Sequence, residues 1–310
     1  MNHKFESEIN NWLEKEVKPK VKLSTYDSYK YRISKYICPH FENYNIKMIS
    51  EDDIQHFVAN LKGASTSKKL SPSTVDGIFI VLMRFFKNCV KEEKIEKNPC
   101  VNVTLPKKAR KKVIVLSIVE RKEILKALQK EDSPRSNLIT TALLTGMRLG
   151  ELCSLKWQAV DLKNKVIFVK STNRRIYVSE NKTKVITTKP KTEDSIRIIP
   201  ISTSVEDIMR KMKLLSSEYV FPKSNGFSYD NRSIQQYFKL TSNQLGIKRK
   251  SFHVLRHTFA TLAVESNMDI KTLSMILGHR SVVTTMNLYV HPNEEHLKMA
   301  MEKVSKFILN

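Results

Sequence analysis

Four residues near the carboxyl end of the sequence have side chains suited to chemistry on a phosphodiester. His253 and Arg256 are three residues apart in a helical pattern, so they should share one helix face. Gly278 should end the next helix, which places His279 in a tight loop and Tyr289 near the end of a short helix. Arginine binds two phosphate oxygens at once, histidine transfers protons, and a tyrosine hydroxyl can attack phosphorus. Each residue alone is more typical of a structural role, and only their combination favours chemistry on a phosphodiester.

In three separate elements, the sequence closely resembles the tyrosine recombinase (phage integrase) family. The family's H-x-x-R, L-G-H and tyrosine ten residues later match residues 253–256, residues 277–279 and Tyr289. Its T-G-x-R-x-x-E-L-x-x-L-x-W matches residues 145–157, and its K-T-x-x-S-x-R matches residues 191–197. The elements occur in the family's order, and the resemblance covers nearly the whole chain.

The resemblance implies a covalent mechanism on DNA. Arg148 and Arg256 would clamp the scissile phosphate and stabilise the transition state. Tyr289 would attack phosphorus, leaving a 3′-phosphotyrosine and a free 5′-hydroxyl, and Lys191 would protonate the leaving oxygen. One phosphoester replaces another, so neither ATP nor an obligatory metal is implied.

The resemblance also implies roles for the histidines and a carboxylate. His253 would transfer protons around the tyrosine, and His279 would hydrogen-bond the phosphate. Glu151 would support the arginine and histidine network, whereas His257 is interpreted as structural.

The identity of the lysine has an alternative. Lys189 lies two residues before Lys191, so both would point to the same side of an extended strand. The K-T-x-x-S pattern favours Lys191, and Pro190 between them disturbs regular strand pairing.

Residues 1–106 predict a helical DNA-binding domain. Apolar residues recur at helical spacing, Pro39 should stop one helix, and Ser50 and Ser71-Pro72 should open two others. The T-Y-x-x-Y pattern at residues 25–29 resembles the start of the family's core-binding domain.

A basic linker is predicted at residues 107–115, and a catalytic domain with a carboxyl-terminal helix at residues 116–310. The linker and a second basic cluster before the catalytic helix could contact phosphates or simply be solvated. The DNA-binding candidates are Lys107, Lys108, Arg110, Lys111, Lys112, Lys248, Arg249 and Lys250.

The predicted fold is mainly α with a small antiparallel β-sheet, as a helical core-binding domain plus an α+β catalytic domain. Ser117 to Glu120 reads as a capping box, and β-type runs follow between residues 166 and 201. Helical patterns return from Ser204, with Ser251 and Ser281 as N-caps.

The composition fits a polyanionic partner. Lys and Arg number 54 against 31 Asp and Glu, a net charge of +23, which favours nucleic acid first and an anionic membrane surface second. No segment approaches the roughly 20 apolar residues of a membrane span. Four scattered cysteines argue against a zinc knuckle or disulfide framework, and no glycine-rich phosphate loop is present in the sequence. We therefore expect a cytoplasmic protein that acts on double-stranded DNA without a cofactor.

Two other functions are compatible with these motifs. A type IB topoisomerase would use the same chemistry but relax DNA as a monomer, and a catalytically idle DNA-binding regulator would share the scaffold alone. The recombinase spacing argues against the first and the full catalytic set against the second. Joining of two duplexes, or a covalent protein–DNA adduct, would discriminate between them.

The carboxyl-terminal segment offers two interpretations. Leu297, Met301, Val304 and Ile308 recur at helical spacing, and this face could pack on its own domain. The family resemblance favours docking onto a neighbouring subunit in a homo-tetramer on two DNA sites. Core-binding-like sequence begins almost at Met1, so we expect action at core sites without an arm-binding domain, unless one has been removed.

Overall fold

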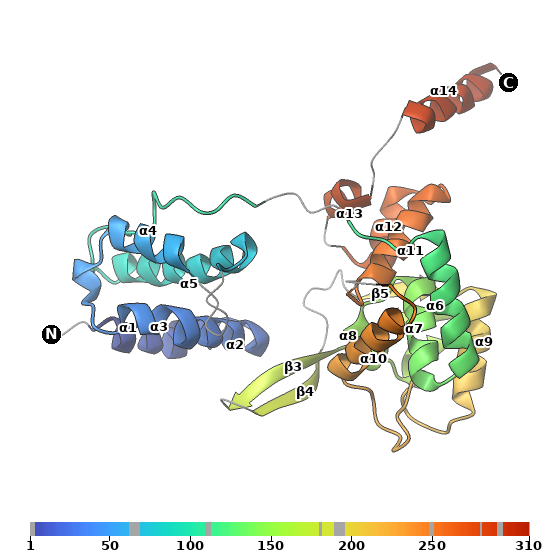
Figure 1. Ribbon diagram of the computed structural model, residues 1–310, viewed down its shortest axis with the longest axis horizontal. Helices are drawn as coiled ribbons and strands as arrows, with labels where there is room; N and C mark the ends of the chain where they lie inside the picture. Colours follow the sequence, from blue (N-terminus) through green and yellow to red (C-terminus); the bar gives the residue numbers. More distant parts are fainter. Residues whose placement is uncertain are drawn as a thin grey trace. The chain divides into compact units, whose positions relative to one another are not determined.

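The computed structural model forms two compact units, which we describe separately (Figure 1). The first is Met1–Lys111 with Ile176–Lys182, and the second is Lys112–Arg175 with Thr183–Asn310. The residues that the structure describes are 4–61, 69–108, 113–179, 182–188, 196–247, 251–279, 281–289 and 294–309. No helix among these residues has the length and apolar character needed to span a membrane.

The first unit is helical, as predicted. Its interior is aromatic: Phe5, Phe41, Phe85 and Phe86 are at most 1% exposed, and their ring centroids lie 5.1–6.1 Å apart in the close pairs. Such rings contribute large buried apolar areas and favourable edge contacts. The helices are α1 (Phe5–Trp12), α2 (Leu23–Arg32), α3 (Cys38–Phe41), α4 (Glu51–Asn60) and α5 (Pro72–Lys91).

Two helix starts of this unit agree with the sequence, and one helix end does not. Ser50 forms a capping box with Asp53, and the Ser71 hydroxyl accepts from the Thr74 amide at the start of α5. The prediction that Pro39 stops a helix is wrong, because Pro39 lies inside α3. A π-helical turn, Ile33–Ile37, directly precedes α3, and this local widening lets the chain continue past the missing amide donor.

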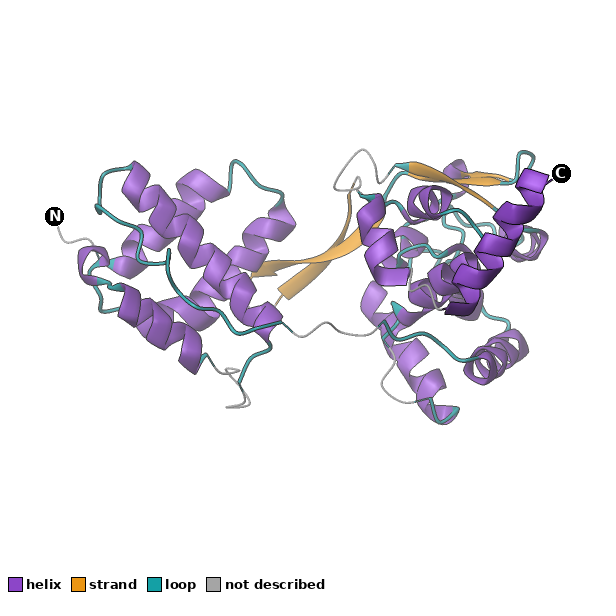
Figure 2. Ribbon diagram, turned by 90° about the horizontal axis from the view of Figure 1, so that it is seen from above, coloured by secondary structure: helices purple, strands orange, loops and turns teal. Residues whose placement is uncertain are grey.

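The second unit is built mainly of helices and contains a three-stranded sheet, whereas the residues of a smaller two-stranded sheet are divided between the two units (Figure 2). Ser117 and Glu120 form the predicted capping box at the start of α6, which satisfies two amide donors of its first turn. The helices are α6 (Ile118–Glu131), α7 (Pro134–Thr145), α8 (Leu149–Cys153), α9 (Thr203–Lys213), α10 (Asn231–Gln244), α11 (Val254–Glu265), α12 (Ile270–Leu277), α13 (Val282–Tyr289) and α14 (Glu294–Leu309).

The strands form two sheets where the sequence predicted one. β1 (Val160–Asp161), β2 (Val166–Val169) and β5 (Arg197–Pro200) make an antiparallel sheet in the order β1-β2-β5. β3 (Thr172–Ser179) and β4 (Lys182–Thr188) pair only with each other among the described residues. In the first sheet, alternate residues face the core, which matches the two-residue period of a half-buried strand.

Candidate active site

Two arginines that are far apart in the sequence of the second unit are held by carbonyl groups at two helix ends. Arg256, in α11, donates from Nη1 to the Gly146 carbonyl (2.8 Å) and from Nη2 to the Leu277 carbonyl (2.6 Å). Arg148, just before α8, donates from Nη2 to the Gly278 carbonyl (2.9 Å). The last carbonyls of a helix lack partners within it and carry partial negative charge, so they orient guanidinium groups well.

Both helix ends require glycine. Gly146 and Gly278 end α7 and α12 in the left-handed region, with φ of 64° and 63°. A Cβ at Gly146 would overlap a ring carbon of Phe259, and one at Gly278 would lie 3.0 Å from Cδ of Arg197. The predicted left-handed end at Gly278 is confirmed, and each glycine exposes the carbonyls that hold the arginines.

A buried ion pair also holds Arg148 in place. Glu151 accepts from Nη1 of Arg148 (3.0 Å) and, through both its oxygens, from Nη1 (3.1 Å) and Nη2 (2.8 Å) of Arg197. The side chains of Glu151 and Arg197 are 4% and 5% exposed. Burial raises the pKa of Glu151, but the arginines outweigh this effect and the pKa is lowered. Glu151 therefore contacts both arginines, and its supporting role in the reaction stays a prediction. Arg197 is a partner that the sequence analysis did not single out.

The site has an excess of positive charge. Burial and the nearby Arg148 lower the pKa of Arg256 to about 9, and Glu151 only partly offsets them. Among the described residues, two guanidiniums, Arg148 and Arg197, bond to the carboxylate of Glu151, and Arg256 interacts with it electrostatically. A guanidinium has five donors, so two carbonyl contacts leave donors of the same fork that can reach an anion. This arrangement is suited to binding a phosphate group.

His253 and His279 lie in the same electrostatic environment. Burial, and then Arg256 and Arg148, lower the pKa of His279 to about 4, so its ring is neutral at pH 7. Its Nδ1 lies 2.9 Å from the Thr285 hydroxyl. With the proton on Nε2, Nδ1 accepts from Thr285 and Nε2 is the donor of the ring. His253 immediately precedes α11, where the sequence predicted Ser251 as the N-cap; burial and the neighbouring His257 also lower its pKa.

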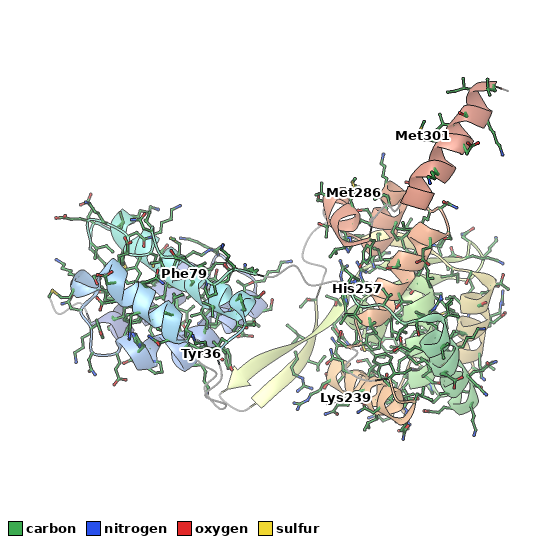
Figure 3. All side chains as sticks on the ribbon, turned by 45° about the horizontal axis from the view of Figure 1, so that its top comes forward. Tyr36, Phe79, Lys239, His257, Met286 and Met301 are labelled. Carbon is green, nitrogen blue, oxygen red and sulfur yellow. The ribbon has the colours of Figure 1, made fainter. Side chains whose placement is uncertain are left out.

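Tyr289 ends α13, as predicted, and is 6% exposed. Its hydroxyl lies 2.7 Å from Nδ1 of His257, which is labelled in Figure 3. His257 had been interpreted as structural, and the sequence carried no signal for this contact, which joins residues 32 positions apart. Burial raises the pKa of Tyr289, while Arg256 lowers it to a smaller extent.

Comparison with known proteins identifies the family. Residues 115–296, more than half of the chain, match the phage integrase family, and residues 4–62 match the N-terminal SAM-like domain of phage integrases. The chain belongs to the phage integrase family. It is a tyrosine recombinase, and these matches favour neither a topoisomerase nor an idle regulator.

One relative and two solved structures are similar to this chain, the structures in fold alone. The recombinase is 27% identical to a tyrosine recombinase XerC-like protein of Caldanaerobacter subterraneus subsp. tengcongensis, over 97% of this chain and 82% of that one. Its fold is similar to that of the Tn1549 transposon integrase in complex with a circular intermediate DNA, with a TM-score of 0.82 and 19% identity over 97% and 99% of the two chains. It is also similar to a lambda integrase in a tetramer bound to a Holliday junction, with a TM-score of 0.71 and 17% identity over 94% and 79%.

Several predicted site residues of the recombinase lie outside the described residues. These are Lys191 and its alternative Lys189, together with Arg110, Lys111, Lys112, Lys248, Arg249 and Lys250. Lys107 and Lys108 are described and exposed, and Nζ of Lys108 lies 2.5 Å from a carboxylate oxygen of Asp76. Their contact with DNA stays a prediction.

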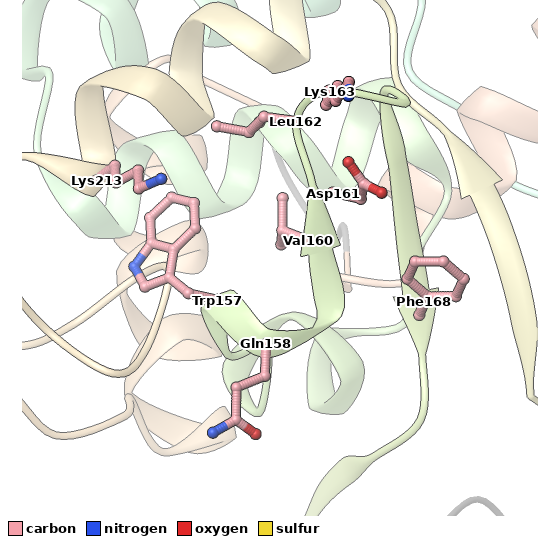
Figure 4. Close-up of a pocket in the computed structure, with 8 residues that line it drawn as sticks. All are labelled: Trp157, Gln158, Val160, Asp161, Leu162, Lys163, Phe168 and Lys213. Carbon is pink, nitrogen blue, oxygen red and sulfur yellow. The ribbon is translucent and has the colours of Figure 1, made fainter.

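A separate pocket of about 460 Å³ lies beside the three-stranded sheet of the recombinase (Figure 4). Trp157, Phe168 and Lys213 help to line it, and none of the predicted catalytic residues does. Trp157 ends the T-G-x-R-x-x-E-L-x-x-L-x-W element, so the two ends of that motif serve different places in the unit.

Proposed function

We propose that this protein is the site-specific recombinase of a mobile element, and that it cleaves and rejoins DNA through a 3′-phosphotyrosine at Tyr289. The observation that carries the proposal is the pair of guanidiniums, Arg148 and Arg256, fixed by the carbonyls at residues 146, 277 and 278. A phosphodiester bound to them would be neutralised as charge accumulates on its oxygens during attack.

The proposed reaction exchanges one ester for another. The Tyr289 oxygen forms a bond to phosphorus, and the bond from phosphorus to the 5′-oxygen breaks. The leaving oxygen takes a proton from Lys191, a role that rests on the sequence motif alone. His279 would donate from Nε2 to a phosphate oxygen, since its Nδ1 faces Thr285. His253 takes part in proton transfer near the tyrosine, and attack by a 5′-hydroxyl of another strand reverses the steps and joins new partners.

A covalent-adduct assay tests the proposed nucleophile. DNA fragments that the protein binds are selected from random sequence, nicked near the mapped contact, incubated with protein and run on a denaturing gel. We expect an adduct whose modified peptide contains Tyr289. Tyr289→Phe should abolish the adduct and leave DNA affinity largely intact, while Tyr219→Phe, elsewhere in the same unit, should form it normally. An adduct formed by Tyr289→Phe would place the nucleophile elsewhere.

We further propose that the recombinase acts as a homo-tetramer on two DNA sites in the cytoplasm, with α14 docking onto a neighbouring subunit. Met301, Val304 and Ile308 of α14 are 67%, 50% and 76% exposed, and Met301 is labelled in Figure 3. Apolar side chains at this spacing form a continuous face that favours burial against a partner.

Cooperative binding to DNA with two sites tests the docking. Met301→Glu with Val304→Glu should abolish cooperativity without changing affinity for one site, and truncation after Val290 should do the same. Ser305→Glu, also exposed on α14, is the matched control and should bind as the unmodified protein does. Full cooperativity in the truncated protein would refute the proposal.

The basic residues of the predicted linker are proposed to contact DNA phosphates. Replacing Lys107 and Lys108 with Gln should weaken binding to all sequences alike and reduce its salt dependence, because each phosphate contact releases counterions. A change of sequence preference in this variant would contradict a role limited to the phosphates.

A further inference from the structure

His257 contacts the hydroxyl oxygen of Tyr289, the protein atom that forms a bond to phosphorus in the proposed reaction. Its Nδ1 lies 2.7 Å from the hydroxyl oxygen of Tyr289, and the two ring centroids are 5.7 Å apart. Tyr289 is 6% exposed and His257 is partly buried, so the contact is largely shielded from bulk water. When the ring proton of His257 is on Nε2, Nδ1 accepts this hydrogen bond and the phenol proton points toward it.

A second histidine, His253, contacts His257 on the side toward solvent. His253 lies four residues before His257, and its ring meets the His257 ring edge to face with centroids 4.6 Å apart. Part of His253 is exposed to solvent although burial lowers the pKa of its ring, whereas Tyr289 is buried. The two imidazoles thus lie between the buried phenol and the surface, on one side of α11.

We propose that His257 is the group that accepts the phenol proton when Tyr289 attacks, and that His253 serves as the next group between His257 and solvent. The proposal rests on the proposed function, in which Tyr289 is the nucleophile. As the bond from the Tyr289 oxygen to phosphorus forms, the proton moves to Nδ1 of His257 and the bond to the 5′-oxygen breaks. When a 5′-hydroxyl later attacks the phosphotyrosine, the same proton returns to the departing phenol.

The electrostatics of the two groups fit a transfer that accompanies the attack. Burial, and then Arg256, lower the pKa of His257, so the ring is neutral before reaction and Nδ1 has a lone pair when the proton is on Nε2. Burial raises the pKa of Tyr289, so the phenol keeps its proton until then. A phenol oxygen becomes far more acidic as it bonds to phosphorus, and a neutral imidazole in contact is then a sufficient base.

The charged and titratable groups beside His257, among the described residues, are few. His253 and Arg256 belong to the same stretch of chain around α11, and Tyr289 comes from α13. Arg256 also faces the phosphate site, so DNA binding brings a negative charge close to the guanidinium that opposes protonation of His257.

The proposal is tested by single-turnover cleavage of a nicked substrate at saturating protein. The cleavage rate is measured at a series of pH values from pH 6 to pH 9. His257→Asn places an amide oxygen near the position of Nδ1, so it can accept the hydrogen bond but not the proton. We expect a rate about 100-fold lower for both His257→Asn and His257→Ala, in line with typical losses of a general base. The unmodified rate should be nearly flat above pH 7, whereas the variant rates should rise with pH.

Two further measurements complete the test. Added imidazole should partly restore His257→Ala, and His56→Asn, in the first unit, should leave the rate unchanged. A normal rate and pH profile for His257→Asn would overturn the proposal, because the contact would then only position the phenol. A faster rate for His257→Ala would overturn it as well, since the contact would then hold the tyrosine back. The adduct assay with Tyr289→Phe is separate, so failure of the proposed function is recognised independently.

Discussion

The two units bury different kinds of side chain. Every buried polar or charged residue among the described residues lies in the second unit, from Ser136 to Thr285. The described core of the first unit consists of apolar and aromatic side chains, with Phe5 and Phe85 fully enclosed. Burying a charge is unfavourable unless it is paired and hydrogen-bonded, so stability alone does not explain Glu151, Arg197 and Arg256.

The difference indicates what each interior is for. Aromatic packing needs only shape and volume, and it stabilises the first unit without specifying a ligand. In the second unit, carbonyls at two helix ends and one carboxylate hold guanidiniums at defined positions. The resulting excess of positive charge suits this interior to binding an anion, as the proposed function requires.

The largest effect is expected when the buried carboxylate is removed. Glu151→Ala leaves Arg197 buried without its carboxylate partner, and we expect a loss of about 3–5 kcal/mol in the free energy of unfolding. Cleavage should also fall, because Arg148 loses the same partner. Denaturant unfolding and the adduct assay measure the two effects.

A double variant separates these two effects. Glu151→Leu with Arg197→Met replaces the ion pair by apolar side chains, which should recover much of the stability. Cleavage should stay low, since Arg148 is still unsupported. Recovery of both properties would show that the carboxylate serves stability alone and would remove the contrast between the units.

In the first unit, we expect a substitution that lowers the free energy of unfolding by a comparable amount without changing the rate of cleavage. Phe85→Ala removes a ring that packs against Phe5, Trp12 and Phe86, and it should lower the free energy of unfolding by about 3–5 kcal/mol. Below the unfolding temperature, the cleavage rate at saturating protein should be unchanged. A slower chemical step in this folded variant would mean that the aromatic core also shapes the active site.

Much of this contrast could be predicted from the sequence, but not its most informative contacts. Capping boxes at Ser117 and the left-handed turn at Gly278 depend on neighbouring residues, so their patterns are readable. The same holds for the motifs that contain Arg148, Arg256 and Tyr289. The partner of Arg197 lies 46 residues away and that of His257 lies 32 away, so only the folded chain brings them together.

Local patterns also failed where backbone geometry departs from the regular helix. Pro39 was expected to stop a helix, but the π-turn before it lets the helix resume. The strands were expected to form one sheet, but β3 and β4 pair separately from β2 and β5. Strand pairing depends on long-range contacts that no single run of residues specifies.

A smaller and more selective effect is expected for the partly exposed arginine. Arg148 is 36% exposed at its side chain, so Arg148→Lys should change the free energy of unfolding little. Lysine keeps the charge but lacks the planar fork, and we expect cleavage to slow by about 100-fold while DNA affinity persists. Arg135→Lys, which faces Glu131 in the same unit, is the matched control and should cleave normally. Normal cleavage by Arg148→Lys would show that charge alone is sufficient at this position.

The smallest effect is expected from the titration of His279. Burial, and then Arg256 and Arg148, lower its pKa in the folded protein to about 4, whereas the ordinary value is 6.5. Between these two values the unfolded chain binds the proton and the folded one does not, so the free energy of unfolding falls as the pH drops from 6.5 toward 4.

His279→Asn removes this titration. When unfolding is measured at pH 7.5 and at pH 5, the free energy of unfolding should depend less on pH in the variant. Inorganic phosphate should reduce the same dependence in the unmodified protein, because an anion on Arg148 and Arg256 stabilises a charged His279. An identical pH dependence in the variant would mean that Arg256 and Arg148 do not lower the pKa of His279. The loop that contains His279 would then lie outside the region in which these arginines act.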